Sequence, residues 1–262
     1  MYLMANFNLK NYNEVTTLKK TKTRALFGIS LTLCFLIFTF LFSLILTPLL
    51  GLNYLNAIFS QGSTTSSTFY AVMINTDSTD SDYATEQAQN YRVRGGAGVL
   101  LEKETYFIVL SAYPNKSDAE SVSEQITTEN IIPEIMEITF QSTNTSSFSA
   151  EEKELYNNCF NFAIDTLNSL YDISYKLDTG TITELTANLN IKNLLLDTTS
   201  YNQQLFANQT DNLKKIRTII SSVSSLLEYV ADEEVLTSTT LPYAGDIRRV
   251  LVRILLVIYE LE

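Results

Sequence analysis

The residues of this chain that could do chemistry are mainly acidic, because the sequence contains no histidine. Among 262 residues, 29 are acidic, 18 are basic and two are cysteines, and the net charge is −11. Without histidine there is no imidazole general base, no Ser-His-Asp or Cys-His nucleophile and no zinc site of the usual composition. The negative charge disfavours nucleic acid, whose phosphates are bound by basic patches. The candidate groups that remain are carboxylates, a glycine-rich run and two thiols.

Two short runs have a composition that could hold a ligand. The run DSTDSD at 77–82 carries three carboxylates, but an EF-hand loop needs ligands at alternating positions, a central glycine and a late glutamate. Acidic residues at the start of a helix explain this run better. The run GGAG at 95–98 follows a predicted helix and precedes a predicted strand, which is the reverse of a nucleotide-binding turn. We therefore expect neither a metal site nor a cofactor.

Glu102 and Glu104 are the remaining candidates for acid–base catalysis. A pair of carboxyl groups can cleave a glycosidic bond when one acts as the acid and the other as the base or nucleophile. These two glutamates alternate in a predicted hairpin turn, so we interpret them as solvated surface charges. Cys34 lies in a long apolar run and Cys159 on an apolar helix face, where a thiol packs as a small hydrophobic group. We expect no catalytic residue, and hence a protein that is not an enzyme.

The first structural element that the sequence predicts is a membrane anchor. Residues 1–24 carry a charge of +4, and the remainder of the chain sums to −15. The run 25–46 contains 22 residues without a charge, and a helix of that length covers about 33 Å, enough for a hydrocarbon core of about 30 Å. The alternative, a cleaved signal peptide, has a shorter apolar region of about 7–15 residues followed by an A-x-A-like site. The residues NAIF at 56–59 lack that pattern.

The basic tail predicts the orientation of the anchor. Lys and Arg accumulate on the cytoplasmic side of spanning helices, so the N-terminus should be cytoplasmic and the bulk of the chain should lie outside the cell membrane. Runs rich in Ser and Thr predict polar linkers after the anchor and in the middle of the chain. The predicted segments are a cytoplasmic tail (1–24), a transmembrane anchor (25–52), a linker (53–68), an α/β domain (69–140), a second linker (141–149) and a helical domain (150–262).

The α/β domain is predicted from alternating strand and helix patterns. Short β-favouring apolar runs predict strands, and apolar residues at helical spacing predict helices. The expected elements are strands at 69–74, 99–101, 106–110 and 133–140, a helix over 77–92 with Asp80 or Ser81 as N-cap, and a helix that opens at 115–118. Ser117 and Glu120 fit a capping box for the second helix. The order β-α-β-β-α-β is typical of a ferredoxin-like, split βαβ sandwich, in which two helices cover one face of a sheet.

The run YFIVLSAYPNKSDAE at 106–120 resembles the second half of a SPOR (sporulation-related) domain. In that family a strand beginning with an aromatic residue ends in a small-small-aromatic turn, and a polar cap and a helix starting Asp/Glu-Ala-Glu follow. The run FYAV at 69–72 and the helix after it resemble the first half, although INT at 74–76 stands where the family usually has Gly-x-aromatic. The resemblance implies that 69–140 binds the glycan strands of peptidoglycan through the open face of its sheet, in bacterial cell division or sporulation.

The strands of this block are apolar on both faces, which predicts that something covers the second face. Side chains alternate along a strand, and a solvent-facing sheet surface should carry polar residues. Aromatic rings on this face could stack against a sugar; alternatively, the helical domain of the same chain could lie across it and bury apolar side chains. On the first interpretation, the candidate glycan-binding residues are Tyr70, Val72, Phe107, Val109, Ser111 and Tyr113.

The C-terminal block is helical throughout in its hydrophobic pattern. Apolar stripes at helical spacing occur over 155–177, 213–230 and 247–258, and Leu185, Leu189, Lys192 and Leu196 mark a further helix. The simplest assembly is a bundle of about four helices. The run 250–259 is too short for a second membrane span and contains Arg253. The predicted fold class is therefore α+β, with an anchor, a SPOR-like sandwich and an all-α bundle.

These patterns together predict a membrane-anchored binding protein outside the cell membrane. Its expected ligand is peptidoglycan glycan, and its expected contact with the membrane is one N-terminal helix. The alternative is a structural or interaction protein whose SPOR-like sheet is covered by its own helical domain and does not bind glycan. The discriminating observation is whether the second face of the sheet contacts solvent or helices.

Overall fold

The computed structural model of the protein describes residues 67–127, 131–236 and 241–261. These residues belong to one compact unit, Thr64–Glu262. The predicted cytoplasmic tail, the predicted membrane anchor and nearly all of the first linker lie outside the described residues. Within the described ranges, no helix combines the length and the apolar character that crossing a membrane requires.

The described part has an α+β architecture, an antiparallel sheet with several helices, which confirms the α+β class. The elements are β1 (Ser67–Asn75), α3 (Ser81–Val93), β2 (Val99–Glu102), β3 (Tyr106–Tyr113), α4 (Lys116–Ile126), β4 (Glu134–Phe140), α5 (Ala150–Asp178), α6 (Glu184–Ala207), η1 (Asp211–Leu213), α7 (Lys214–Ala231), α8 (Glu233–Leu236) and α9 (Tyr243–Glu260). The strands form an antiparallel sheet in the order β2-β3-β1-β4. Among the described residues, β2 and β4 are therefore the edge strands.

A β-bulge in β3 decides which side chains share a face of the sheet. Val72 of β1 pairs with Ser111 of β3, and the register then shifts, so that Leu110 has no partner on β1. A bulge places two residues of one strand opposite one residue of the other and changes the alternation locally. Val109 and Ala112 consequently belong to the same core, although they are three positions apart.

Helices α3 and α4 cover one face of the sheet. Asp80 caps α3, and its side chain accepts hydrogen bonds from two backbone N–H groups of the first turn, as expected of aspartate at an N-cap. Asn115 is the N-cap of α4 and makes no side-chain capping bond. The predicted capping box of Ser117 and Glu120 is therefore wrong, because Ser117 lies inside the first turn. The small core beneath these helices contains Ile74, Ala88, Ile108 and Leu110.

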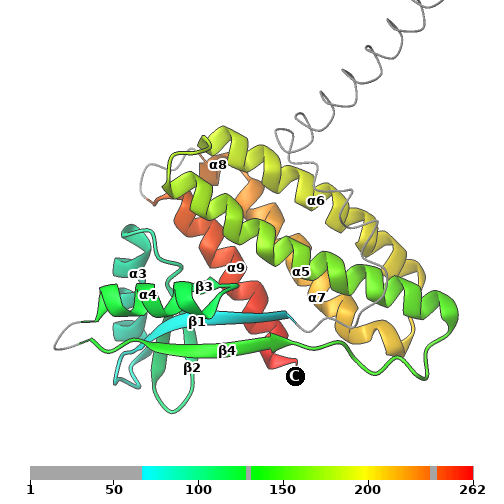
Figure 1. The fold of residues 1–262 in the computed structure, drawn as a ribbon, viewed down its shortest axis with the longest axis horizontal. Coiled ribbons are helices and arrows are strands. Elements are labelled where there is room, and N and C mark those ends of the chain that lie inside the picture. Colours follow the sequence, from blue (N-terminus) through cyan, green and yellow to red (C-terminus); the bar gives the residue numbers. More distant parts are fainter. Residues whose placement is uncertain (1–66, 128–130, 237–240, 262) are drawn as a thin grey trace, which may run out of the picture. The chain divides into compact units, whose positions relative to one another are not determined.

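Helix α9 covers the other face of the sheet, and α5 packs against the end of β4 through Phe160 and Phe140. Figure 1 shows α9 (red) running between the strands and the remaining long helices, and it contacts β2, β3 and β4 as well as α5 and α7. The run 250–258 of α9 is buried on nearly every side, apart from Arg253 and the half-buried Val257, as expected of a helix that is apolar all round. Side chains of β1, β3 and β4 join those of α5, α7 and α9 in one continuous core.

The spacing of the leucines in helix α6 suggests one buried face, but a different face of the helix packs against the bundle. Leu185, Leu189 and Leu196 are exposed, Leu196 to 69%. The buried face instead combines apolar and polar residues, namely Ala187, Asn188, Ile191, Thr198 and Leu205. Asn188 donates hydrogen bonds to the carbonyl of Ala231 and to the hydroxyl of Tyr243, both at 3.1 Å. Since its amide protons are satisfied inside the bundle, Asn188 can replace an apolar residue there.

The N-terminal end of α9 is fixed to the glycine-rich loop that follows α3. Arg249 donates to the carbonyl of Gly98 at 3.0 Å, and Arg92 of α3 pairs with the buried Asp246 at 3.2 Å. Arg248 also bonds the carbonyl of Gly95 and the carboxylate of Asp178. A Cβ atom on Gly245 would lie 3.1 Å from the Gly95 backbone. The run 95–98 therefore serves as a packing surface for α9.

We expect Gly98→Ala to lower the stability of the protein more than Gly180→Ala does. Both glycines have a positive φ, +53° and +66°, and an L-residue there costs about 1–2 kcal/mol. Only at Gly98 would the new Cβ also lie 2.5 Å from the Ala88 carbonyl, whereas nothing lies within 4 Å at Gly180. Urea unfolding of both variants measures the difference. Equal losses would show that the close approach of α3 to this loop is absent.

Candidate functional site

The six predicted glycan-binding residues are divided between the two faces of the sheet. Phe107 and Val109 belong to the core that the sheet shares with α5 and α9. Val72 alternates with residues of that core and pairs with Ser111, so both point to the side of α3 and α4. Val72 and Val109 are 0% exposed, and Phe107 and Ser111 are also buried. These four residues do not form one surface that a glycan strand could reach.

Tyr70 and Tyr113 are the two members of the predicted set that retain partial exposure. They pair across the central strands β1 and β3. The hydroxyl of Tyr113 accepts a hydrogen bond from Ser111 at 2.9 Å. Tyr113 is the last residue of β3, immediately before the turn into α4. The structure therefore places the accessible part of the predicted set at one end of the sheet.

Tyr113 continues into a row of aromatic rings on α5, which we call the tyrosine row (Tyr113, Tyr171 and Tyr175). The rings of Tyr113 and Tyr171 meet edge to face, with centroids 5.9 Å apart and an interplanar angle of 72°. The rings of Tyr171 and Tyr175 stack with centroids 6.4 Å apart and an angle of 18°. Tyr175 is 57% exposed. Both arrangements are preferred geometries of aromatic pairs, so the rings hold one another in place.

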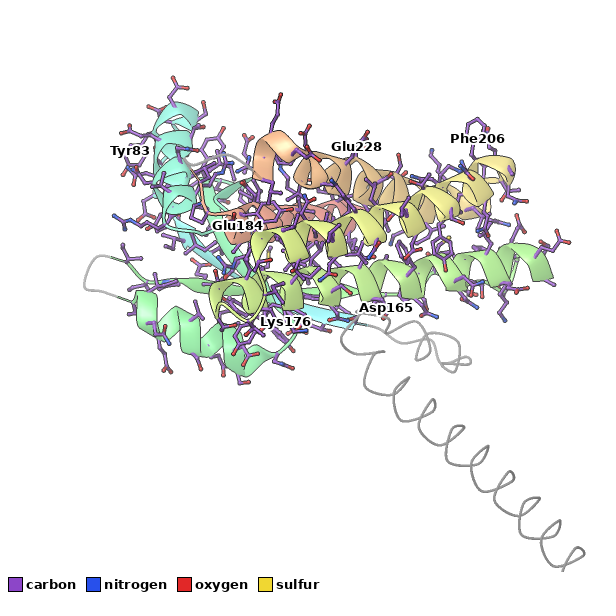
Figure 2. The ribbon with its side chains drawn as sticks, turned by 90° about the horizontal axis from the view of Figure 1, so that it is seen from above. Tyr83, Asp165, Lys176, Glu184, Phe206 and Glu228 are labelled. Carbon is purple, nitrogen blue, oxygen red and sulfur yellow. The ribbon has the colours of Figure 1, made fainter. Side chains whose placement is uncertain are left out.

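Polar groups border the tyrosine row. The hydroxyl of Tyr171 donates to Oδ2 of Asp118 at 3.5 Å, and Asn115 donates to the same oxygen at 3.1 Å. Burial, followed by the negative charge of Asp118, raises the pKa of Tyr171 above its usual value. The hydroxyl therefore stays protonated at neutral pH. Lys176 lies near the C-terminal end of α5 (Figure 2) and pairs with Asp172 at 2.6 Å.

The remaining candidate residues lie in turns, at the end of a strand or at a helix N-terminus. Glu102 is the last residue of β2, Glu104 lies in the turn between β2 and β3, and both are exposed. Asp80 of the acidic run caps α3, and Asp77 occupies a turn with φ of 51°. Among residues 67–127, 131–236 and 241–261, no group of three or more acidic or cysteine side chains has an arrangement that would bind a metal ion.

Tyr171 and Tyr175 were not among the residues that the sequence singled out. They lie four positions apart on α5, and Tyr175 is outside the buried stripe of that helix; this spacing is the signal that could have revealed them. Comparison of the chain with protein-family models, with curated proteins and with solved structures found no match. The function must therefore be inferred from the residues themselves.

Proposed function

We propose that this chain is a membrane-anchored, non-catalytic binding protein that contacts peptidoglycan glycan outside the cell membrane. The uncharged run 25–46 behind a basic tail supports the anchor and its orientation. The order β-α-β-β-α-β and the SPOR-like run 106–120 support the ligand class. By the same resemblance, the biological setting would be cell division or sporulation.

The observation that carries the proposal is the tyrosine row at the end of the sheet. A pyranose ring has an apolar face of C–H groups that stacks on an aromatic ring, and its hydroxyls pair with carboxylates and phenols. Tyr175 supplies an exposed ring, while Tyr171 and Asp118 supply a donor and an acceptor beside it. A small number of polar groups around an apolar surface is typical of sites that bind small ligands. Because the rings already contact one another, little ordering is needed on binding.

Tyr175→Ala is expected to weaken binding of the full-length protein, in detergent micelles, to purified peptidoglycan sacculi by about tenfold, the usual cost of losing an aromatic contact. Tyr175→Phe should keep most of the affinity, since it keeps the ring face. The matched control is Tyr83→Ala on α3, because Tyr83 is 46% exposed and lies outside the row. Cosedimentation with intact sacculi, and with sacculi stripped of stem peptides, measures these affinities. Equal binding by all three variants would contradict a contact at the row.

A second function is favoured by the burial of the sheet on both faces. In this alternative the protein is a structural or interaction protein, and the sheet serves only as a core for α9 on one side and for α3 and α4 on the other. The 0% exposure of Val72 and Val109 supports it. It predicts that the wild-type protein does not sediment with either preparation of sacculi, so the same experiment separates the two functions.

A further inference from the structure

A cleft of about 480 Å³ lies on the molecule away from the tyrosine row, between β2, α7 and α9. It combines an edge strand, a hydroxyl-rich helix and two opposite charges. The residues that matter for its chemistry are Leu100, Ser221, Ser225, Arg253, Leu256 and Glu260.

One wall of the cleft is the edge of the sheet. Within the described residues, β2 has a single strand neighbour, β3, so one side of its backbone lacks a strand partner. Unpaired N–H and C=O groups of an edge strand are a template for the addition of another strand. Arg249 bonds the carbonyl of Gly98, directly before β2 begins. Because this contact fixes the start of β2, the strand is held in place beside the cleft.

The floor and the second wall come from α7 and α9. Leu256 is almost fully buried and Leu226 is half-buried, so the floor is apolar. Ser221 and Ser225 lie one helical turn apart on the exposed side of α7 and offer small hydroxyls. Because serine side chains are small, this wall leaves room for a peptide alongside β2. The serine hydroxyls can hydrogen-bond to the side of that peptide that faces away from β2.

Two charges of opposite sign stand along α9 in the cleft. Arg253 and Glu260 are exposed, and neither makes an ion pair with another described residue. Seven positions on a helix correspond to about 10.5 Å along its axis, which is the length of about three residues of an extended strand. Side chains three positions apart on a strand point to opposite faces, and the nearest spacing on one face is four positions, about 13 Å. Because the side chains of arginine and glutamate are long and flexible, the two charges match an acidic and a basic side chain four positions apart on the same face of a strand.

We propose that this cleft binds an extended peptide segment, which adds to the sheet beside β2. Its backbone pairs with the edge of β2, its apolar side chains lie on Leu256, and its acidic and basic side chains face Arg253 and Glu260. Strand addition derives affinity from main-chain hydrogen bonds and specificity from alternate side chains. Opposite charges across the contact add specificity and register.

The lining of the cleft favours a peptide over a saccharide. No aromatic ring of the described residues lines it, whereas the tyrosine row offers an exposed ring. The cleft and the tyrosine row are thus two sites of different chemistry, and the peptide site does not depend on glycan binding.

The test uses the full-length protein in detergent micelles and a set of fluorescent octapeptides. The peptides alternate Val and Thr and carry Asp, Lys or Ser at the third and seventh positions, which lie on the same face of an extended strand. Peptides with one Asp and one Lys are expected to bind about tenfold more tightly than the peptide with Ser at both positions. Arg253→Glu should reverse this preference and make the peptide with Lys at both positions the best ligand. The matched control is Arg94→Glu, because Arg94 is also exposed but lies at the end of α3, outside the cleft.

Hydrogen exchange provides the structural readout. Bound peptide should slow the exchange of amide protons in Val99–Glu102, and Tyr175→Ala should leave peptide binding unchanged. Failure of every peptide to bind, equal affinities in wild type and Arg253→Glu, or loss of binding in Tyr175→Ala would each overturn the proposal. Protection of the β2 amides by a chitin oligosaccharide in place of a peptide would overturn it as well.

Discussion

Replacing Val109 by asparagine is expected to lower the free energy of unfolding by about 3–5 kcal/mol, because an apolar side chain is lost from the core and an amide is left without partners. Val109 is 0% exposed and packs in the core between the sheet and α9. Urea unfolding of a fragment covering residues 64–262, followed by circular dichroism, measures this loss as a lower midpoint. A loss of this size is among the largest that single substitutions cause.

The matched control is Tyr70→Asn, which introduces the same asparagine side chain at another of the six predicted glycan-binding residues. Tyr70 is half-buried at the end of the sheet, so the expected loss is smaller, about 1–2 kcal/mol. Small and equal losses at Val109 and Tyr70 would show that both residues face solvent. That result would restore the open glycan-binding face that the alternation of residues suggests.

The thiol of Cys159 is expected to be almost unreactive in the folded protein and fully reactive in the unfolded chain. Cys159 is 0% exposed, and burial raises its pKa from 9.0 to about 12. At pH 8 the thiolate population is then about a thousandfold smaller than in the unfolded state, and the thiolate is the reacting form. Iodoacetamide labelling of the 64–262 fragment, read by mass spectrometry with and without urea, measures the ratio.

The control for labelling is Glu228→Cys on α7, an exposed position at the surface of the bundle (Figure 2). This thiol should react in the folded protein at nearly the rate of a free cysteine. Because the pKa of Cys159 is raised on folding, its contribution favours the folded state below about pH 9 and is lost as the pH rises to about 12. Labelling of folded Cys159 within about tenfold of the unfolded rate would contradict its burial on the core side of α5.

Helices and strands could be predicted from the sequence because their apolar residues recur at clear helical or strand spacing. Which side chains share a face of the sheet could not be predicted. Strands at 69–74 and 106–110 correspond to β1 and β3, which extend to Asn75 and Tyr113. The extra residue Leu110 changes the alternation within β3, and a bulge depends on the pairing of two strands rather than on either one. The predicted set of six residues therefore combined side chains from both faces.

The helix α6 was predictable from its leucines, but its buried face was not. The leucines at 185, 189 and 196 have helical spacing, yet they point outward. Asn188 lies in the buried face because Ala231 and Tyr243 satisfy its amide. A polar residue with buried partners looks like a surface residue in a sequence, and the partners are more than 40 positions away.

The candidate site was only half predictable from the sequence. Tyr70 and Tyr113 followed from the SPOR-like strands, but Tyr171 is 58 positions beyond Tyr113 and belongs to a different predicted domain. Only the docking of α5 beside the start of α4, shown by the contact between Tyr171 and Asp118, brings these rings together. The cleft beside β2 was not predictable, because it needs the placement of α7 and α9 against the sheet.

The position of α9 in the chain has a consequence for biosynthesis. Arg249 and the glycine-rich loop that it fixes are about 150 residues apart, and α9 follows every other described element. While the ribosome is still making the chain, the strands can pair and receive α3 and α4, but their second apolar face has no cover. Interactions between residues so distant in sequence form late. Until then, exposed apolar surface and unpaired strand edges promote association between chains. Nascent copies of this protein therefore need protection from aggregation until α9 emerges.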